Sequence, residues 1–495
     1  MSNTVTIGIV FVVYLLAMIG IGFYYFNRSN KLSEFFLGGR SLNKWVAAFS
    51  AQASDMSGWL LIGLPGLAFA IYSGTTEAIW TAIGLAIGTY LNWLIVAKRL
   101  RKYTEVAGDS ITLSDFFENR FRDKTHLLKF VSGIFTLIFF TIYAASQFSA
   151  SAKLLNSVFG MDYVTALWVG AAIIVAYTFL GGFMAVCLTD FVQGMLMFAA
   201  LVVVPVVVFV SHGGVSVTFD TISSFTTDVF SFLPRDGMGA INWMLLISCL
   251  AWGLGYFGQP HILVRFMAIR DEKSVQPARV IAMIWVIITL TCAILVGLTG
   301  RAYLPNLADA ETVFMSMVQN IFPPIVAGVL LTAILAAIMS TADSQLLVSA
   351  STVTIPFGNM EAEGKISSKT LVWISRLAVV VISVIAVLLV TNPESSVFGI
   401  VQYAWAGFGA AFGPLVLFSL FWRRTTWQGA LAGMVSGGVT AIVWQNLHGG
   451  IFDVYELVPG FLIASLLIIV VSLCTKPNEE VMEEFDRVKT AKIGE

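Results

Sequence analysis

Three acidic residues attract attention because they interrupt stretches that are otherwise apolar. Asp55, Asp190 and Asp343 each lie within a run of apolar residues long enough to cross a membrane. Burying a charge in lipid costs at least about 3 kcal/mol, so each carboxylate needs a partner or a function. Arg376 is the only basic residue well inside such a run and could neutralise one of them. A structural ion pair is therefore an alternative for Asp190 or Asp343, whereas Asp55 is the strongest functional candidate.

Hydroxyl groups surround the third aspartate at helical spacing. In an α-helix, Ala337, Ser340, Thr341 and Ser344 would share one face. Three hydroxyls and a backbone carbonyl on one face suit a small hard cation, which prefers oxygen ligands. The hydroxyls could instead donate to carbonyl groups of the preceding turn, as is common for Ser and Thr.

Two of the apolar runs are interrupted near their midpoints. The first reads WVAAFSAQASDMSGWLLIGLPG from Trp45, and the second reads SCLAWGLGYFGQPHIL from Ser248. Proline lacks a backbone donor and glycine favours unwinding, so both runs are predicted to be broken helices. Two broken helices that cross in opposite directions are typical of the central binding site of a transporter. The alternative is that Gly and Pro are simply common in membrane helices.

Aromatic residues accompany the second break. Trp252 and Tyr256 are one helical turn apart on it, and Tyr143 lies in another apolar run. These rings could form the wall of a small cavity, although most aromatics in membrane helices are packing residues.

The amino-acid composition indicates the class of protein that must hold these acidic, hydroxyl and aromatic residues in place. Of the 495 residues, 58% are apolar and 12% are charged, and the mean hydropathy is +0.86. A soluble domain carries about twice that charged fraction. The composition therefore excludes a soluble enzyme, a disordered chain and a nucleic-acid-binding protein, and it predicts an integral protein of the lipid bilayer. The four cysteines form no close pair, so neither a disulfide framework nor a zinc site is indicated.

A membrane-spanning helix needs roughly 20 mostly apolar residues. The apolar runs do not alternate in polarity as barrel strands would, so all of them are predicted to be helices. Thirteen runs qualify, near residues 5–26, 45–71, 77–97, 127–155, 163–181, 188–211, 240–264, 278–300, 321–349, 370–390, 397–421, 429–446 and 454–474.

Basic residues predict the orientation of these helices. The loops after odd-numbered spans, together with the C-terminal tail, hold 24 of the 28 Lys and Arg residues when Lys129, Arg265 and Arg279 at span edges are included. Positive charge marks the cytoplasmic side. The N-terminus is therefore predicted outside and the C-terminus in the cytoplasm.

Two segments outside the spans have some character. A T-x-x-D cap at Thr112 precedes Phe116, Phe117 and Phe121, which predicts a short cytoplasmic helix lying on the membrane surface. The charged tail, 475–495, is expected to be loosely ordered.

Some stretches of the chain are distinctive enough to compare with known families. They are LGGRSL from Leu37, ASDMSGWLLIGLPG from Ala53, YTFLGGFMAV from Tyr177, Thr189–Asp190, WGLGYFGQPHILVRFMA from Trp252, IMSTADSQLLV from Ile338 and YAWAGFGAAFGP from Tyr403. By these stretches the chain resembles the sodium:solute symporter family along nearly its whole length. The pair Gly181–Gly182 matches the general signature of the family, and the stretches beginning at Ala53 and Trp252 resemble its proline-transporting branch.

The resemblance implies a fold and a function. The fold would be the all-α leucine-transporter type, in which two inverted repeats of five helices, here 45–211 and 240–421, form the core. One extra helix would precede the core and two would follow it, so that 1–474 is a single transmembrane domain and 475–495 a cytoplasmic tail. The function would be sodium-coupled uptake of L-proline across the cytoplasmic membrane by alternating access, without enzymatic activity and without an obligate protein partner.

The resemblance also assigns candidate site residues. A sodium ion, which is co-transported, would be held by the carbonyls of Ala53, Met56 and Ala337 and the hydroxyls of Ser340 and Thr341, and the family also ties Asp55 to sodium. Some relatives hold a second sodium with residues matching Asp190, Ser340 and Ser344, and here Asp343 could strengthen such a site or form a structural pair. The solute pocket would consist of Ser57, Gly58, Tyr143, Trp252, Tyr256, Gln259 and Pro260.

Other functions are compatible with parts of the pattern. A proton could replace sodium as the coupling ion if Asp55 or Asp343 titrates, and another small zwitterion or carboxylate could replace proline. A cation channel would more often show rings of pore residues than paired broken helices. A membrane-embedded enzyme would need a metal motif or a nucleophile–base pair, and the chain has only four histidines.

Overall fold

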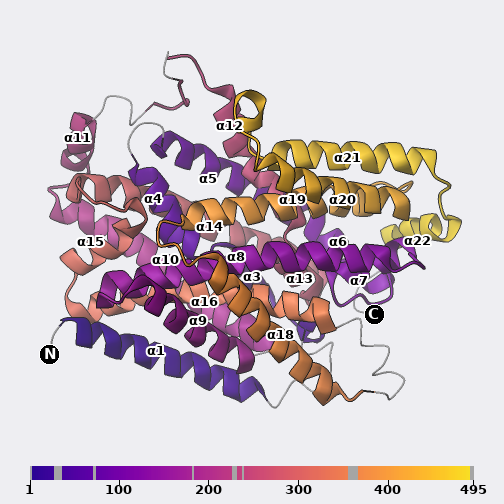
Figure 1. The fold of residues 1–495 in the computed structure, drawn as a ribbon, viewed down its shortest axis with the longest axis horizontal. Helices are drawn as coiled ribbons and strands as arrows, with labels where there is room; N and C mark the ends of the chain where they lie inside the picture. The colour runs from indigo at the N-terminus through magenta and orange to yellow at the C-terminus, as the bar shows by residue number, and fades with distance from the viewer. Residues whose placement is uncertain are drawn as a thin grey trace.

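The computed structural model describes residues 3–26, 36–70, 74–180, 183–225, 231–236, 239–354 and 366–490. The described part is almost entirely helical (Figure 1). Its only two β-bridges are isolated, between Leu42 and Ile269 and between Arg235 and Ile241. In the most apolar stretches of Pro324–Thr354 and Val397–Phe421, 83% of the residues are buried. In the helix at Asn3–Phe26 the corresponding share is 22%, and this helix lies at the edge of the molecule (Figure 1).

All thirteen predicted spans are helical in the structure. Ten are single helices: α1 (Asn3–Phe26), α8 (Leu127–Phe159), α9 (Tyr163–Leu180), α10 (Phe183–Ser211), α14 (Val275–Tyr303), α16 (Pro324–Thr354), α18 (Ser368–Leu389), α19 (Val397–Phe421), α20 (Trp427–Trp444) and α21 (Leu457–Cys474). The third span continues from α5 (Gly74–Leu91) through a π-helical turn, Asn92–Val96, into α6 (Ala97–Val106). Within the described ranges, nine helices are long and apolar enough to cross a membrane on their own.

The second and seventh spans are broken, as the sequence predicts. The second consists of α3 (Lys44–Asp55), a π-helical turn at Trp59–Gly63 and α4 (Leu64–Phe69). The seventh consists of α12 (Trp243–Ala251), a 3₁₀ segment at Trp252–Gly258 and α13 (Pro260–Ala268).

Each break is visible in the backbone angles. Met56, the residue after α3, has φ −82° and ψ 73°, and Gln259, the residue before α13, is extended at φ −83° and ψ 105°. Pro260 occupies the first turn of α13, where its missing donor costs nothing.

Glycine permits a close approach at the second break. A Cβ atom at Gly255 would lie 1.9 Å from Nε1 of Trp405, and one at Gly258 would lie 2.3 Å from the carbonyl oxygen of Phe408. Both neighbours belong to α19, so α19 packs directly on the backbone of the broken segment.

Short helices lie between and after the spans. They are η1 (Gly38–Arg40), α7 (Leu113–Phe121), α11 (Val215–Phe225), η5 (Glu272–Ser274), η6 (Ala310–Thr312), α15 (Val313–Ile321), η8 (Gly450–Asp453) and α22 (Glu479–Thr490). The apolar pattern does not predict α11 and α15, because both are too short to resemble spans.

The structure corrects the prediction for α7. The capping box is present, since the Thr112 hydroxyl accepts from the Asp115 N–H at 3.1 Å. However, Phe116, Phe117 and Phe121 are buried inside the protein. The ring of Phe117 packs 5.9 Å from that of Phe412 on α19, so the apolar face of α7 covers the helix bundle instead of the lipid surface.

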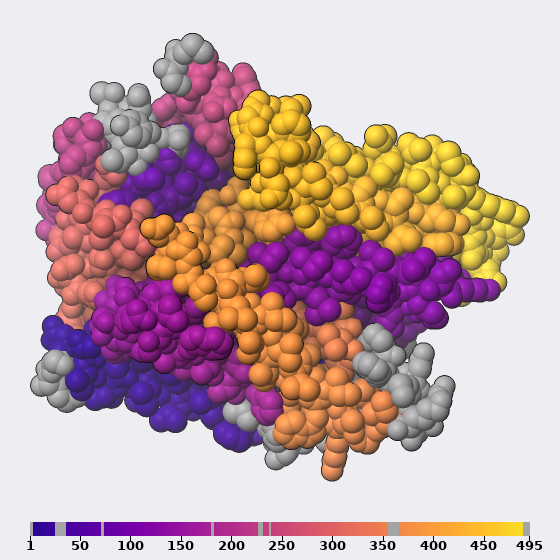
Figure 2. All heavy atoms as spheres, in the orientation of Figure 1, coloured from indigo at the N-terminus to yellow at the C-terminus, as the bar shows by residue number. Residues whose placement is uncertain are grey.

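The structure also corrects the prediction for the tail. Residues Glu479–Thr490 form α22, and Phe485 is buried against Tyr103 with ring centroids 6.3 Å apart. The Arg423 guanidinium donates to Asp486 at 2.8 Å. Within the described residues 475–490, an amphipathic helix that docks on the protein therefore replaces the expected loose tail (part of the yellow region in Figure 2).

Candidate functional site

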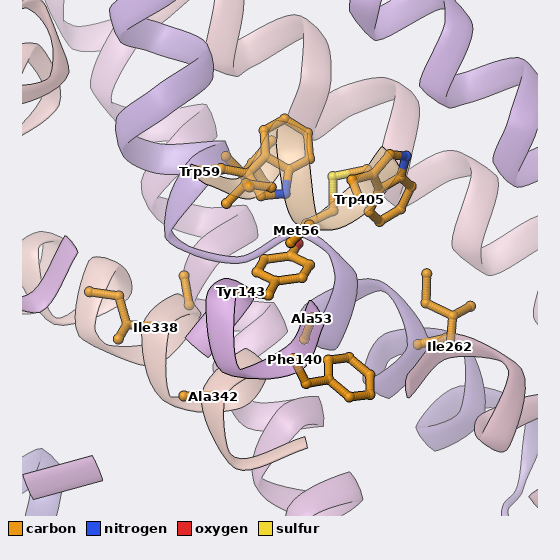
Figure 3. Close-up of a cluster of buried hydrophobic side chains, with 14 of the residues drawn as sticks. Ala53, Met56, Trp59, Phe140, Tyr143, Ile262, Ile338, Ala342 and Trp405 are labelled. Carbon is orange, nitrogen blue, oxygen red and sulfur yellow. The ribbon is translucent and has the colours of Figure 1, made fainter. Parts of the chain in front are cut away.

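The break in span 2 lies against α8, α16 and α19. Figure 3 shows Met56 and Tyr143 at this break, with Trp59 and Trp405 to one side and Ile338 and Ala342 on the neighbouring helix. A Cβ atom at Gly58 would meet Ala150 of α8 at 3.1 Å and Ile338 of α16 at 3.2 Å. The broken segment is therefore enclosed by protein, where its free backbone groups can find partners.

Oxygen atoms expected to bind a cation converge where α3 meets α16. The Ser340 hydroxyl donates to the Ala53 carbonyl at 2.8 Å and lies 3.1 Å from the Ala337 carbonyl. The Thr341 hydroxyl donates to the same Ala53 carbonyl at 3.3 Å. These residues are fully buried. Two carbonyls and two hydroxyls of the expected five ligands thus lie together, and Met56 follows the last residue of α3.

Some hydroxyls on this face of α16 donate to carbonyl groups of their own helix, which is the alternative to cation binding. The Ser344 hydroxyl donates to the Ser340 carbonyl at 2.8 Å, and the Ser340 hydroxyl has the nearby Ala337 carbonyl as a second acceptor. The Thr341 hydroxyl, by contrast, donates across to α3. This face of α16 is consequently joined to the end of α3.

Asp55 connects the two broken helices. Its Oδ2 atom accepts a hydrogen bond from the Tyr256 hydroxyl at 2.6 Å, and its backbone carbonyl accepts from Trp59 Nε1 at 3.1 Å and from the Tyr143 hydroxyl at 3.3 Å. The side chain is fully buried, and its Oδ1 atom has no hydrogen-bond partner among the described residues. A buried carboxylate oxygen without a donor is a suitable ligand for a cation.

Ser57 and Gly58 are held by a residue that the sequence analysis missed. Gln147 of α8 donates from Nε2 to the Ser57 hydroxyl at 3.2 Å and accepts from the Gly58 N–H at 3.2 Å. The sequence does indicate a role for Gln147, because a glutamine within a long apolar helix needs a hydrogen-bond partner in lipid.

Aromatic rings surround the 3₁₀ segment of the second break. Trp252 lies 5.1 Å from Phe398, 5.5 Å from Tyr455 and 6.4 Å from Trp405, and the Tyr256 ring meets Trp405 edge-on at 4.9 Å. Trp405 also donates from Nε1 to the Trp252 carbonyl at 2.8 Å. The structure thus adds Trp405 to the aromatic residues that the sequence singled out.

Gln259 and Pro260 lie at the end of the second break, where the chain enters α13, and not among the aromatic rings around Trp252. Gln259 Nε2 donates to the carbonyls of Gly255 and Trp405, at 3.1 Å and 3.2 Å. Pro260 begins α13, and the next residue, His261, is buried between Phe140 and Tyr143. The side chain of Gln259 therefore supports the extended backbone at the break.

Asp190 is paired with Arg265, which the count of basic residues places at the edge of a span. Its Oδ2 atom accepts from Arg265 Nη2 at 3.1 Å and from the hydroxyls of Ser50 at 2.6 Å and Ser54 at 3.1 Å. Arg265 is 1% exposed, so it is a buried residue of α13 and not a residue of the membrane edge. The sequence could have indicated this burial, because apolar residues flank Arg265 on both sides, ILV before it and FMAI after it.

Asp343 adjoins this pair through Ser344, which accepts from Arg265, whereas Arg376 contacts aromatic rings. Asp343 Oδ1 accepts a long hydrogen bond of 3.4 Å from Ser344, and its Oδ2 atom has no hydrogen-bond partner in the described ranges. Arg376 stacks over Phe179 and Trp373 at 5.1 Å and 5.3 Å. The expectation that Arg376 neutralises an aspartate is therefore replaced by the Arg265–Asp190 pair. Gly181 and Gly182, the expected family signature, lie outside the described residues.

Solved structures share this fold at low sequence identity. The chain matches a Na⁺-coupled sialic acid symporter with a TM-score of 0.76 and 18% identity, covering 95% of this chain and 98% of that one. It matches MhsT in complex with L-phenylalanine with a TM-score of 0.54 and 13% identity, covering 88% and 98%. The shared architecture is the leucine-transporter-type fold of an all-helical, multi-pass membrane protein.

Comparison of sequences then gives the family. Residues 35–437 match the model of the sodium:solute symporter family. The sodium/proline symporter of Salmonella typhimurium is 48% identical over 484 residues, which cover 96% of this chain and 94% of that protein. The high-affinity proline transporter PutP of Bacillus subtilis is 48% identical over 475 residues, covering 95% and 98%. The chain therefore belongs to the sodium:solute symporter family, and it is a transporter, not an enzyme.

Proposed function

We propose that this protein carries L-proline across the cell membrane together with sodium. The observation that carries the proposal is the convergence of the Ala53 carbonyl with the hydroxyls of Ser340 and Thr341, beside the break in span 2. The near full-length similarity to sodium/proline symporters supports the same ion and the same solute.

The Ser340 and Thr341 hydroxyls, which now donate to the Ala53 carbonyl, would instead turn their oxygen atoms toward the sodium ion. Its ligands would be the carbonyls of Ala53, Met56 and Ala337 and the hydroxyls of Ser340 and Thr341. Asp55, two residues after Ala53 at the end of α3, would contribute negative charge. Sodium held there would fix the end of α3 against α16, and this supports a pocket that binds the solute better when sodium is present.

The solute would bind where the two breaks meet. Proline is a zwitterion with an apolar ring, which suits aromatic walls combined with free backbone groups. We assign Ser57, Gly58, Tyr143, Trp252, Tyr256, Gln259 and Pro260 to this pocket, and the contacts of Asp55 with Tyr143 and Tyr256 support the grouping. Trp405 and Gln147 would hold the two breaks in place.

Orientation and internal repeats belong to the same proposal. The N-terminus would lie outside and the C-terminus in the cytoplasm, because basic residues gather in the odd-numbered loops and the tail. Residues 45–211 and 240–421 would be the two inverted repeats, each opening with one of the broken helices.

A binding measurement on purified protein tests the proposal. We expect radiolabelled proline to bind in sodium and to bind at least tenfold more weakly when potassium replaces sodium at fixed pH. Equal binding in the two salts would contradict sodium coupling. Tighter binding of another small zwitterion than of proline would keep the coupling and change the solute.

A further inference from the structure

Gln147 of α8 is a fully buried amide that faces the break in span 2. Its Oε1 atom accepts a hydrogen bond from the Gly58 N–H at 3.2 Å. Its Nε2 atom donates to the Ser57 hydroxyl at 3.2 Å and to the Ser146 hydroxyl at 2.8 Å. One side chain therefore joins α8 to two consecutive residues of the broken segment.

The Gly58 N–H is a backbone donor at the start of the helical turns that lead into α4. The preceding N–H group, that of Ser57, bonds within the chain to the Asp55 carbonyl at 3.0 Å. Gly58 directly precedes the π-helical turn, and its N–H bonds to the side chain of Gln147. A donor at the start of a helix favours an acceptor that carries negative charge.

The surroundings of this contact are those of the proposed solute pocket. Tyr143 lies one turn before Gln147 on the same face of α8, and its hydroxyl donates to the Asp55 backbone carbonyl at 3.3 Å. The Oδ1 atom of Asp55 is buried and has no hydrogen-bond partner in the part of the chain that the structure describes. Gln147 and this free carboxylate oxygen thus belong to the same polar break, which is otherwise enclosed by apolar side chains.

A carboxamide can exchange the hydrogen bond that it makes to Gly58. Its oxygen accepts from an N–H group as a carboxylate oxygen does, and its NH₂ group carries two donors. Rotation about the last side-chain torsion of Gln147 would turn these donors toward an anion that has taken over the Gly58 N–H. Hydrogen bonds to a charged acceptor are roughly twice as strong as neutral ones, so the exchange favours a carboxylate.

We propose that Gln147 selects for a carboxylate in the transported solute. Its amide oxygen gives up the Gly58 N–H to the solute carboxylate, and its Nε2 group then donates to the same carboxylate. The inference rests on the proposed proline symport and identifies the side chain that recognises one end of the solute. Gln147 is a specificity-determining residue in this account, because a solute with a neutral amide at that end loses the charge-assisted bonds.

Binding of L-proline and L-prolinamide to purified protein in saturating sodium tests the inference. Prolinamide keeps the ring and the ammonium group, and a neutral carboxamide replaces the carboxylate. Isothermal titration calorimetry at neutral pH should show that the wild-type protein binds proline about thirtyfold more tightly than prolinamide, as expected for lost hydrogen bonds to a charged group. Gln147→Leu should weaken proline binding by about tenfold and prolinamide binding by no more than about threefold.

A second variant changes the charge without changing the size. In Gln147→Glu, the new carboxylate repels the carboxylate of proline and accepts from the NH₂ group of prolinamide, so the variant should bind prolinamide more tightly than proline. Gln319→Glu is the control, because the Gln319 amide on α15 donates to the Ser157 carbonyl at 3.2 Å, away from the break. This control should keep the preference of the wild-type protein. Size-exclusion chromatography checks the folding of every variant.

Three outcomes would overturn the inference. A Gln147→Leu protein that loses affinity for both compounds by the same factor would show that the amide only supports the break. If that variant does not fold, an unchanged preference for proline in Gln147→Glu has the same meaning. Equal binding of proline and prolinamide by the wild-type protein would also overturn it, whether or not any variant folds. Proline binding to the wild-type protein that does not depend on sodium would instead contradict the proposed function itself.

Discussion

At the scale of single residues, Asp55 joins the two breaks through a side chain with one satisfied and one free oxygen. The Tyr256 hydroxyl occupies Oδ2 at 2.6 Å, and Oδ1 lacks a hydrogen-bond partner within the described part of the chain. Two tyrosines from other helices therefore contact Asp55: the Tyr256 hydroxyl donates to its carboxylate, and the Tyr143 hydroxyl donates to its backbone carbonyl. A change of charge at Asp55 should be felt at both walls of the proposed pocket.

We predict that Asp55→Asn removes sodium-stimulated proline uptake while the protein still inserts into the membrane. Asparagine keeps the size of the side chain but lacks the charge that attracts the cation. Uptake in intact cells over a range of sodium concentrations, normalised to protein abundance, measures the effect. Asp162→Asn, at an exposed carboxylate before α9, is the control and should behave as wild type. A normal sodium dependence of Asp55→Asn would exclude Asp55 from coupling.

We predict that Ser340→Ala and Thr341→Ala each raise the sodium concentration for half-maximal uptake by about tenfold. Each change removes one oxygen that now faces Ala53, and one such contact contributes about 1.5 kcal/mol. Ser351→Ala is the comparison, because that hydroxyl only bonds back to Val348 on the same helix. Unchanged sodium activation in both test variants would mean that these hydroxyls serve α16 alone.

At the scale of elements, the second break depends on glycine because two backbones meet there. A Cβ atom at Gly88 of α5 would lie 2.2 Å from the Gly253 carbonyl oxygen, and one at Gly253 would lie 2.3 Å from the Gly84 carbonyl oxygen. The 3₁₀ segment is thus held between α5 on one side and α19 on the other. Asn92 of the π-helical turn supports it further by donating to the Tyr256 carbonyl at 3.0 Å.

We predict that Gly88→Ala destabilises the protein and impairs uptake. Its methyl group would push α5 away from the broken segment, and overpacking of this kind costs about 1–3 kcal/mol. Thermal unfolding of purified protein measures the loss. Gly20→Ala is the matched control, since a methyl group on that residue of α1 meets no atom within 4 Å. Equal melting temperatures for the two variants would contradict the close crossing.

The helices themselves could be predicted from the sequence because each has a local signature. Apolar length identified all thirteen spans, and the Gly–Pro pattern identified the break before Pro260. The partner of Asp190 could not be found in this way, because Arg265 is 75 residues away and a count of loop charges treats it as exposed. The docking of α7 and α22 was missed for a similar reason: an amphipathic pattern does not distinguish a protein surface from a lipid surface.

At the scale of the molecule, contacts at both ends of the bundle connect distant segments. At one end, Glu311 pairs with Lys153 of α8 at 2.7 Å and accepts from the N–H groups of Val397 and Phe398 at the start of α19. At the other end, α22 packs on α6 and α7. Our proposed orientation assigns the Glu311 end to the outside and the α22 end to the cytoplasm.

We predict that a membrane-impermeant maleimide labels the two ends selectively. In intact cells it should react with a cysteine introduced by Glu394→Cys, in the loop between α18 and α19, and not with the native, exposed Cys474 at the end of α21. Permeabilised cells should show labelling at both positions, identified by mass spectrometry of the peptides. The reverse pattern in intact cells would invert the orientation.

The most direct test of the central claim is uptake of radiolabelled L-proline by the purified protein in sealed liposomes. An inward sodium gradient at equal internal and external pH should accumulate proline above its external concentration, and an inward proton gradient without sodium should not. Asp55→Asn liposomes provide the negative control under both conditions. Accumulation driven by the proton gradient alone, or proline entry that never exceeds equilibration under the sodium gradient, would contradict sodium-coupled symport.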